Sequence, residues 1–305
     1  MAAGTEVSSP LDADAEFTAH RPLLFSIAYE ILGSVGDAED VLQDSYLRWR
    51  TADLTGIGNP RAYLAQVVTR QAMTTLRSAA RRRESYVGPW LPEPLAADGQ
   101  DPPEGIRHVL SGEAVTTAML LILETLTPLQ RAVFVLREVF EFGYAEIASV
   151  VGRSEPAVRQ VNQRAREHVR ARRESAYGAV AVPADAASVA ERFSIAAATG
   201  NVQSLMDVLA PDVVFLADGG GVVNAARCPV HGPDKVARLL IGLMTKGQRM
   251  GELDIRFAVY NGMPAVAASI DGVLDQVTSI EVRGGLVTAV YCVRNPEKLG
   301  MIVNS

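Results

Sequence analysis

The sequence has few cysteines and no long apolar run. Cys228 and Cys292 are far apart and belong to no CxxC or Cys/His cluster, which disfavours a zinc site and a disulfide scaffold and predicts two ordinary buried thiols. No segment approaches the roughly 18 uninterrupted apolar residues of a membrane span. The first residues carry acids where a secretory signal carries basic and apolar stretches. We therefore expect a cytoplasmic protein without metal, cofactor or membrane contact.

The chain also lacks an overall basic charge. Its net charge is −6, and an acidic protein is on average repelled by the phosphates of nucleic acids. The charges are unevenly distributed, however. Six arginines and no acid lie from Arg61 to Arg83, and seven arginines against two glutamates lie from Arg153 to Arg173. Because local charge governs contact with phosphates, two separate basic segments predict two contacts with DNA.

Three blocks of different composition follow one another along the 305 residues, 48% of which are hydrophobic. Residues 12–87 and 112–176 show helical periodicity, and the proline-rich segment 88–111 between them predicts an extended linker. From 184 to 305 helical patterns give way to β-branched runs separated by turn residues, namely VVFLAD, IRFAVY, AVAASI, VTSIEV and LVTAVYCV. The predicted fold class is multidomain, with two all-α modules followed by an α+β domain.

The most specific local pattern lies in the second helical block. Thr127 and Pro128 predict a capped helix start, and Gly152 with Ser154 predicts a tight turn between a short helix and a longer basic one, which makes a helix-turn-helix. The apolar stripe of the longer helix comprises Val158, Val161, Ala165 and Val169. The outward positions are Arg159, Gln160, Gln163 and Arg164. Arginine and glutamine pair with guanine and adenine edges in the major groove, so these positions predict duplex DNA reading, the alternative being a solvated basic helix in a bundle.

The first block contains a helix with an acidic outer face. SVGDAEDVLQDSYLRWR places Ala38, Val41, Leu42, Ser45 and Trp49 inward. Its outward positions are Glu39, Asp40, Gln43 and Asp44. Taken alone, such a stripe is typical of a solvated surface.

This helix has the neighbours RPLLFSIAYEILGS and NPRAYLAQVVTRQAMTTLRSAARRR, and LTPLQRAVFVLREVF lies downstream. Together these segments resemble the extracytoplasmic-function (ECF) sigma factors, and the resemblance covers about the first 175 residues. The resemblance implies sigma region 2 at 12–87 and sigma region 4 at 112–176. It implies core RNA polymerase (β′ clamp helices and β flap) and promoter DNA as partners. The implied polymerase-facing positions are Asp40, Gln43 and Asp44, with Trp49 polymerase-facing or supporting. The inward position of Trp49 favours a core role.

The same resemblance assigns the segment after the acidic helix to melting and reading the minus-ten promoter element. The positions concerned are Asn59, Arg61, Tyr63, Arg70, Arg77, Arg81, Arg82 and Arg83. Extruded bases need aromatic or polar pockets while arginines hold the backbone. Tyr63 has the alternative role of a core aromatic. The helix-turn-helix would contact the minus-thirty-five element.

Three further motifs resemble a subgroup of these factors with a fused SnoaL-like C-terminal domain, a cone-shaped α+β fold. The motifs are WLPEP (90–94), DGGG (218–221) and NPEKL (295–299). The resemblance implies a built-in regulatory domain at 184–305, with regulatory positions at Trp90, Leu91, Pro92, Asp218, Gly219, Gly220, Gly221, Asn295, Pro296, Lys298 and Leu299. We expect a flexible DGGG loop that, with the C-terminal tail, contacts the linker or the helical modules. Val222 departs from the pattern, which commonly has a basic residue there.

The C-terminal domain also has acid/base candidates in Asp218, His231 and Asp275. His231 lies in a His-Gly-Pro segment typical of a structural turn, and the glycines after Asp218 favour a flexible loop, so we expect no enzyme. A small ligand in the cone stays open. The rival hypothesis is a small-molecule-sensing helix-turn-helix regulator, or a DNA-tethered cyclase-like enzyme, that does not join polymerase.

Overall fold

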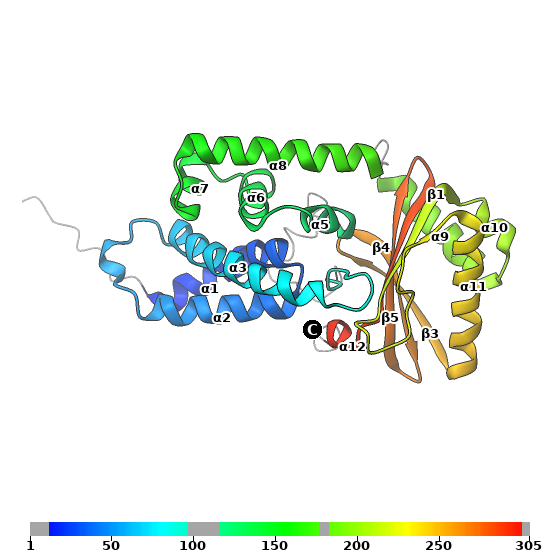
Figure 1. Cartoon of the computed structure of the whole chain (residues 1–305). Helices are drawn as coiled ribbons and strands as arrows, with labels where there is room; N and C mark the ends of the chain where they lie inside the picture. Colours follow the sequence, from blue (N-terminus) through cyan, green and yellow to red (C-terminus); the bar gives the residue numbers. More distant parts are fainter. Residues whose placement is uncertain (1–11, 97–115, 177–182, 301–305) are drawn as a thin grey trace, which may run out of the picture.

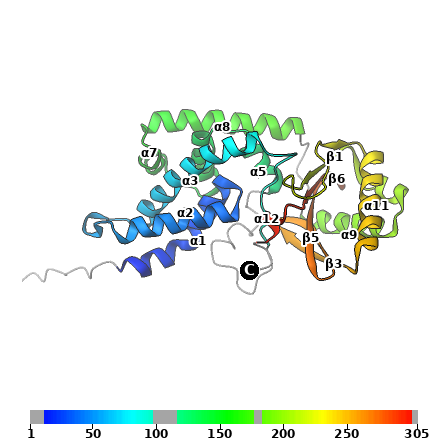
Figure 2. The same cartoon turned by 60° about the horizontal axis from the view of Figure 1, so that its bottom comes forward.

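The computed structural model describes residues 12–96, 116–176 and 183–300. A helical body occupies one end of the molecule and a sheet domain the other, with helix α12 (Pro296–Leu299) between them (Figures 1 and 2). The predicted fold class, two helical modules followed by an α+β domain, is therefore confirmed.

The first helical module consists of α1 (Ala13–Leu32), α2 (Val35–Arg50), the short 3-10 helix η1 (Leu54–Gly56) and α3 (Pro60–Glu84). The Asp12 carboxylate caps α1, and Gly33, with φ +68°, ends it in the left-handed conformation that favours glycine. Ser34 then caps α2 through the backbone N–H of Asp37. All five predicted inward residues of α2 are buried, so its acidic stripe faces outward as the periodicity indicated.

The second helical module consists of α5 (Thr117–Leu123), α6 (Pro128–Phe134), the π-helical turn η2 (Val135–Val139), α7 (Tyr144–Val151) and α8 (Glu155–Ala176). Thr127 caps α6 in a capping box with Gln130. The π-helical turn interrupts the continuous helix that the sequence pattern suggests, and the N–H of Phe140 bonds to the carbonyl of Val135. Val135 and Leu136 are both fully buried in this turn, although they are adjacent in the sequence and a regular apolar stripe does not require both to be buried.

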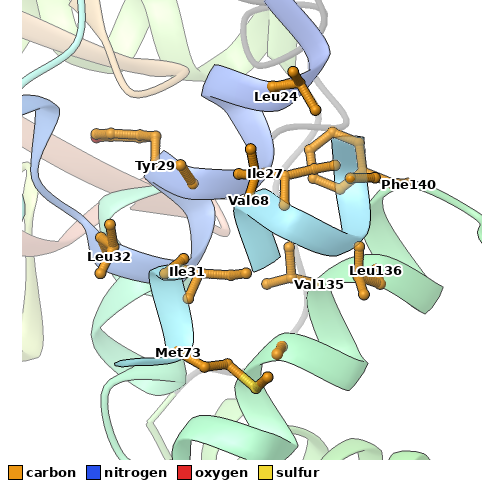
Figure 3. Packing of buried hydrophobic residues seen from close by; sticks show 14 of the residues in the cluster. Leu24, Ile27, Tyr29, Ile31, Leu32, Val68, Met73, Val135, Leu136 and Phe140 are labelled. Carbon is orange, nitrogen blue, oxygen red and sulfur yellow. The ribbon is translucent and has the colours of Figure 1, made fainter. Parts of the chain in front are cut away.

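One hydrophobic core spans both helical modules. Figure 3 shows Ile27 of α1 and Val68 of α3 beside Leu136 of η2. The guanidinium of Arg131, which is 1% exposed, donates to the carbonyl of Glu30 at 3.1 and 3.2 Å and pairs with Glu124. The two modules are therefore packed together in this structure.

The C-terminal domain is a six-stranded sheet in the order β2-β1-β6-β5-β4-β3. β1 is parallel to β6, and the other neighbours are antiparallel. The strands are β1 (Leu209–Asp218), β2 (Val230–His231), β3 (Leu253–Tyr260), β4 (Met263–Ile270), β5 (Val273–Arg283) and β6 (Leu286–Val293). All five predicted runs form strands, whereas the two-residue β2 was not predicted. The helices are α9 (Pro183–Thr199), α10 (Val202–Met206) and α11 (Pro233–Met250).

The two faces of this sheet contact different parts of the chain. On one face, residues such as Phe215, Ile280 and Val290 pack with α9, α10 and α11. On the other face, Tyr291 and Val293 share a core with linker residue Leu91, helix α5 and helix α12. Since successive strand residues point to opposite faces, neighbouring positions on one strand reach the two cores in turn.

The two thiols have different surroundings. Cys292 is buried in β6, and burial raises its pKa to about 11, whereas Cys228 is exposed, which corrects the prediction that both are buried. Cys228 follows a turn-rich stretch, 219–227, in which no periodic pattern indicates an inward side. Within residues 12–96, 116–176 and 183–300, no helix has the length and apolar content to cross a bilayer.

Candidate nucleic-acid interface and interdomain contacts

The predicted helix-turn-helix is present as α7, a turn at 152–154 and α8. Gly152 has φ +64°, and its N–H bonds to the carbonyl of Ala148, which closes the end of α7. The inward stripe of α8 is buried or packed on the core. The four predicted reading residues, Arg159, Gln160, Gln163 and Arg164, are all exposed along one side of α8. A basic helix with an exposed polar face is therefore available for a DNA groove.

A buried asparagine, which the sequence pattern did not reveal, fixes α8 against its neighbours. Asn162 is 1% exposed and donates to Glu138 Oε1 at 2.8 Å and to the Tyr144 hydroxyl at 3.2 Å. The guanidinium of Arg159 lies over the Tyr144 ring at 4.2 Å and pairs with Glu155. Because Asn162 occupies an inward position within an apolar stripe, it orients α8 relative to α7.

The acidic stripe of α2 is accessible. Asp40, Gln43 and Asp44 are exposed, and Asp44 accepts a hydrogen bond from Gln71 at 3.1 Å. Leu47, one turn further along, is 56% exposed, although the sequence analysis did not include it. Trp49 is fully buried and donates to the carbonyl of Ala13 at 2.7 Å, which confirms its core role. The outer face of α2 thus combines acidic and amide groups with one large apolar side chain.

Two of the residues assigned to the minus-ten element, Arg61 and Arg70, contact the second module. Arg70 of α3 donates to the carbonyls of Val150 and Ser149 at 2.7 and 2.9 Å, at the C-terminus of α7. A cation at this helix end is favourable because the unpaired carbonyls carry partial negative charge. Gln66 also donates to Ser149 O, at 3.1 Å, and the Arg61 guanidinium lies 5.1 Å from the centre of the Phe142 ring.

The remaining residues of this set have different surroundings. Asn59 caps α3 by accepting from the N–H of Ala62 at 3.0 Å, and Tyr63 packs on Trp49 with ring centres 5.7 Å apart. A cavity of about 560 Å³ lies between η1, α3 and α7, lined by Asn59 and Tyr63. Arg77 is exposed, and the side chains of Arg81, Arg82 and Arg83 lie outside the described part of the chain. Arg61 and Arg70 thus remain exposed, but both contact the second module.

Linker residue Glu93 holds the start of α2. Its carboxylate, 8% exposed, accepts from the Ser34 hydroxyl at 2.8 Å and from the N–H groups of Val35 and Gly36 at 2.7 and 3.3 Å. The N–H of Glu93 donates to the carbonyl of Gly33 at 3.0 Å. Negative charge at a helix N-terminus is favourable, so Glu93 extends the cap that Ser34 provides.

All three of the motifs WLPEP, DGGG and NPEKL meet at Asp218. Its carboxylate is completely buried and accepts from the Tyr86 hydroxyl at 2.6 Å, Leu91 N–H at 2.8 Å and Lys298 Nζ at 2.7 Å. Lys298 also donates to the carbonyl of Leu91 and lies 4.2 Å from the centre of the Trp90 ring. The pKa of Tyr86 is raised, mainly by burial and to a smaller extent by the hydrogen bond to Asp218. The network ties the linker to the C-terminal domain.

The DGGG loop contacts the linker as predicted, but its expected flexibility is wrong, because the contact is tight. A Cβ atom on Gly220, which has φ +63°, would lie 2.5 Å from Asn295 Nδ2. One on Gly221 would lie 3.0 Å from Cβ of Val87. The glycines therefore allow close approach of Asn295, which caps α12, and of Val87, which precedes the linker. Val222 follows as an exposed residue.

Asn261 at the β3–β4 turn forms a second junction, which the sequence analysis missed. Its Oδ1 accepts from the Tyr29 hydroxyl at 2.8 Å and from Leu95 N–H at 3.1 Å. Its Nδ2 donates to Thr117 Oγ1 at 3.2 Å and to the carbonyl of Glu93 at 3.3 Å. One side chain therefore joins α1, the linker and α5. The Asn-Gly pair is a visible turn signal, but it does not indicate these contacts.

The three acid/base candidates do not come together in the described structure. Asp218 points to the linker, His231 is exposed on the short edge strand β2, and Asp275 forms a bidentate pair with Arg294 at 2.8 to 3.2 Å. None of them lines the cavity between the sheet and α9. Their arrangement provides no shared site for proton transfer.

Comparisons with known proteins agree with this arrangement. Residues 17–82 match the model of sigma-70 region 2, and residues 116–169 match that of sigma-70 region 4. The ECF RNA polymerase sigma factor SigJ of Mycobacterium tuberculosis is 40% identical over 93% of this chain and 92% of its own length. The probable ECF RNA polymerase sigma factor SigI of the same species is 29% identical over 93% of this chain and 94% of its own.

A solved structure of SigJ from Mycobacterium tuberculosis superimposes with a TM-score of 0.75 and 35% identity, and it covers 94% of this chain and 98% of that one. The likeness extends through the C-terminal domain as well as both helical modules. The chain belongs to the family of ECF RNA polymerase sigma factors, in the form that carries an additional α+β domain after region 4.

Proposed function

We propose that this sigma factor, acting in the cytoplasm, binds core polymerase through the outer face of α2 and positions it on a promoter by two DNA contacts. α8 reads the minus-thirty-five element as duplex, and α3 holds the melted minus-ten element. The exposed Asp40, Gln43 and Asp44 suit the clamp helices of the β′ subunit, and the second module suits the β flap. Exposed Leu47 adds apolar area to the polymerase contact.

The structure described here is, in this proposal, a closed state of the factor. The supporting observation is that Arg70 caps α7, so a residue assigned to promoter binding serves an intramolecular contact instead. Residues on α3 and α8 have to reach two promoter elements at the same time, which requires the two modules to separate. The C-terminal domain opposes this separation because Asn261 bonds both to Tyr29 of the first module and to Thr117 of the second. It also holds the linker through Asp218, while Glu93 of the same linker holds α2.

Transcription with purified components tests the polymerase contact. Transcription starts mapped after overexpression supply the promoter, and the factor is then combined with core enzyme and that promoter in vitro. We expect Asp40→Arg to reduce both core binding and transcript yield at least tenfold. Asp212→Arg, the same charge change at an exposed position on β1, should leave both unchanged. A factor that binds the promoter fragment but never core enzyme would instead support the rival regulator.

The DNA contact is tested separately on α8. Gln163→Ala and Arg164→Ala should each weaken discrimination at one minus-thirty-five base pair by about tenfold, since a good pair of base contacts provides about 1–3 kcal/mol. Arg192→Ala on the exposed side of α9 is the matched control. Loss of affinity that is equal for every DNA sequence would assign these residues to phosphate contacts rather than to base reading.

A further inference from the structure

The C-terminal domain contains a cavity on the face of the sheet opposite to the linker. It lies between α9, α11 and the inner face of strands β1 and β3 to β6, and has a volume of about 530 Å³. Cavities of roughly 300–1,000 Å³ are typical of small-molecule sites. The sigma function described above uses neither this space nor the residues around it.

The cavity wall is apolar and carries almost no charge. Phe193, Phe215, Leu240 and Ile280 form much of it, and Glu191, exposed on α9, is the one charged residue among the lining positions of the described chain. Burial raises the pKa of the Cys292 thiol to about 11, which keeps it neutral. A charged ligand would lose its hydration here without gaining a partner. The wall therefore suits a neutral, largely apolar molecule.

A few polar groups on the cavity floor provide orientation. Thr278 lies directly across from Cys292 in the β5–β6 register, and Cys292 Sγ lies 3.6 Å from Gln276 Oε1. The Gln276 amide offers a donor and an acceptor, and the Thr278 hydroxyl offers both roles. One hydrogen-bonding group on the ligand is enough to use them. Phe257 and Val259 of β3, 68% and 39% exposed, also line the cavity and give it an apolar, accessible side.

The β3–β4 hairpin connects this cavity to the sigma modules. Ile255 and Phe257 of β3, and Val266 of β4 in register with Phe257, line the cavity. The tip of the same hairpin is Asn261, which binds Tyr29 and linker residue Leu95. Tyr260 beside it packs in the core that contains Leu91. A displacement of the hairpin by a molecule in the cavity acts directly on the junction with the linker.

We propose that this cavity binds a neutral, largely apolar small molecule with one hydrogen-bonding group, and that its occupancy alters the hold of Asn261 on the linker. The second half rests on the proposed role of the C-terminal domain in keeping the factor closed. The ligand would then regulate the factor through the C-terminal domain of the same chain, by changing the contact of this domain with the linker.

Binding is tested on the full-length protein with N-phenyl-1-naphthylamine, a neutral apolar fluorophore with a single N–H donor. We expect saturable fluorescence enhancement with one site per chain. Ala197→Phe, which fills the cavity from α9, should weaken binding at least tenfold, and Met244→Trp from α11 should do the same. Ser188→Phe, at an exposed position of α9 that does not line the cavity, should not. Circular dichroism checks that each variant is folded.

The polar floor has its own variant. Gln276→Leu should weaken binding of the probe about fivefold, the effect of one lost hydrogen bond. Absence of saturable binding to the wild-type protein, or equal binding by wild type, Ala197→Phe and Met244→Trp, would overturn the assignment of the cavity as a ligand site.

Hydrogen exchange with and without the probe tests the coupling. We expect slower exchange in residues 253–266 and changed exchange in residues 90–96, and both effects should vanish in Ala197→Phe. Bound probe with unchanged exchange at 90–96 would refute the coupling. These outcomes are independent of transcription, so a failure to recruit polymerase would contradict the proposed function while leaving the binding result in place.

Discussion

The buried pair of Asp218 and Lys298 allows a quantitative test of how the C-terminal domain holds the linker. The Asp218 side chain is 0% exposed and that of Lys298 is 7% exposed. In Asp218→Asn the shape is nearly kept, but Lys298 loses its counter-ion, and an amide nitrogen replaces one of two acceptor oxygens. Removing one partner of a buried ion pair costs about 3–5 kcal/mol, so we expect a loss of unfolding free energy in this range.

The reverse substitution should be milder. In Lys298→Met the carboxylate keeps three donors, namely the Tyr86 hydroxyl and the N–H groups of Leu91 and Gly220, so we expect a loss of about 3 kcal/mol or less. The double variant should lose less than the sum of the single ones by about 1–3 kcal/mol, because the two residues interact directly.

Guanidinium unfolding followed by tryptophan emission measures these changes, since Trp90 lies against Lys298. Proteolysis within the linker provides a second reading of the same contact. Asp234→Asn is the control, because Asp234 pairs with Arg238 on the surface of α11 and its loss should give no measurable change. A loss below about 1 kcal/mol in Asp218→Asn, or strictly additive effects in the double variant, would refute a stabilising role for the buried pair.

Tyr86 and Gly220 at this junction, and Asn162 on α8, allow three further tests. The pKa of Tyr86 is raised above its ordinary value of 10.0, so its stabilising contribution is complete below that pH and decreases as the pH rises above it. Between pH 8 and 11.5 the free energy of unfolding should therefore fall less steeply in Tyr86→Phe than in the wild type. Parallel curves for the two proteins would contradict this. Gly220→Ala should lower the free energy of unfolding by about 1–3 kcal/mol more than Gly262→Ala. Both glycines have positive φ, but no atom lies near a Cβ on Gly262. Equal losses measured by calorimetry would exclude the close contact at Gly220 as the cause. Asn162→Leu should lower affinity for minus-thirty-five DNA about tenfold without lowering stability. The leucine fills the same buried position but cannot form the hydrogen bonds that orient α8. Unchanged DNA affinity would leave Asn162 with a packing role.

Much of the fold could be predicted because local signals were consistent with one another. Thr127 with Pro128 indicated the start of α6, and Gly152 indicated the end of α7, because capping and left-handed turns have residue preferences. The inward stripe of α2 followed from helical periodicity, which also placed Trp49 in the core. Periodic runs of β-branched residues likewise gave the five long strands.

The contacts between elements could not be predicted in the same way. Periodicity indicates which side of α3 is apolar, but it does not reveal that Arg70 on the polar side bonds to the end of α7. Asn261 and Glu93 bond to residues that are far away in the sequence. The Asn-Gly pair predicts a turn, and the prolines predict a linker, whether or not these distant partners are present. The glycines of the DGGG loop were interpreted as flexible because a need for close approach becomes visible only with Asn295 in place.

The linker residues 91–95 bond to both the first helical module and the C-terminal domain. Leu91 and Leu95 bond to the C-terminal domain through Asp218 and Asn261, while Glu93, midway between them, bonds to Gly33 and the start of α2. The carbonyl of Glu93 also accepts hydrogen bonds from both Tyr29 of α1 and Asn261 of the C-terminal domain, and these two residues bond to each other as well. Since Glu93 and Asn261 each bond to both sides of the junction, a single substitution at either residue would weaken several of its contacts at once.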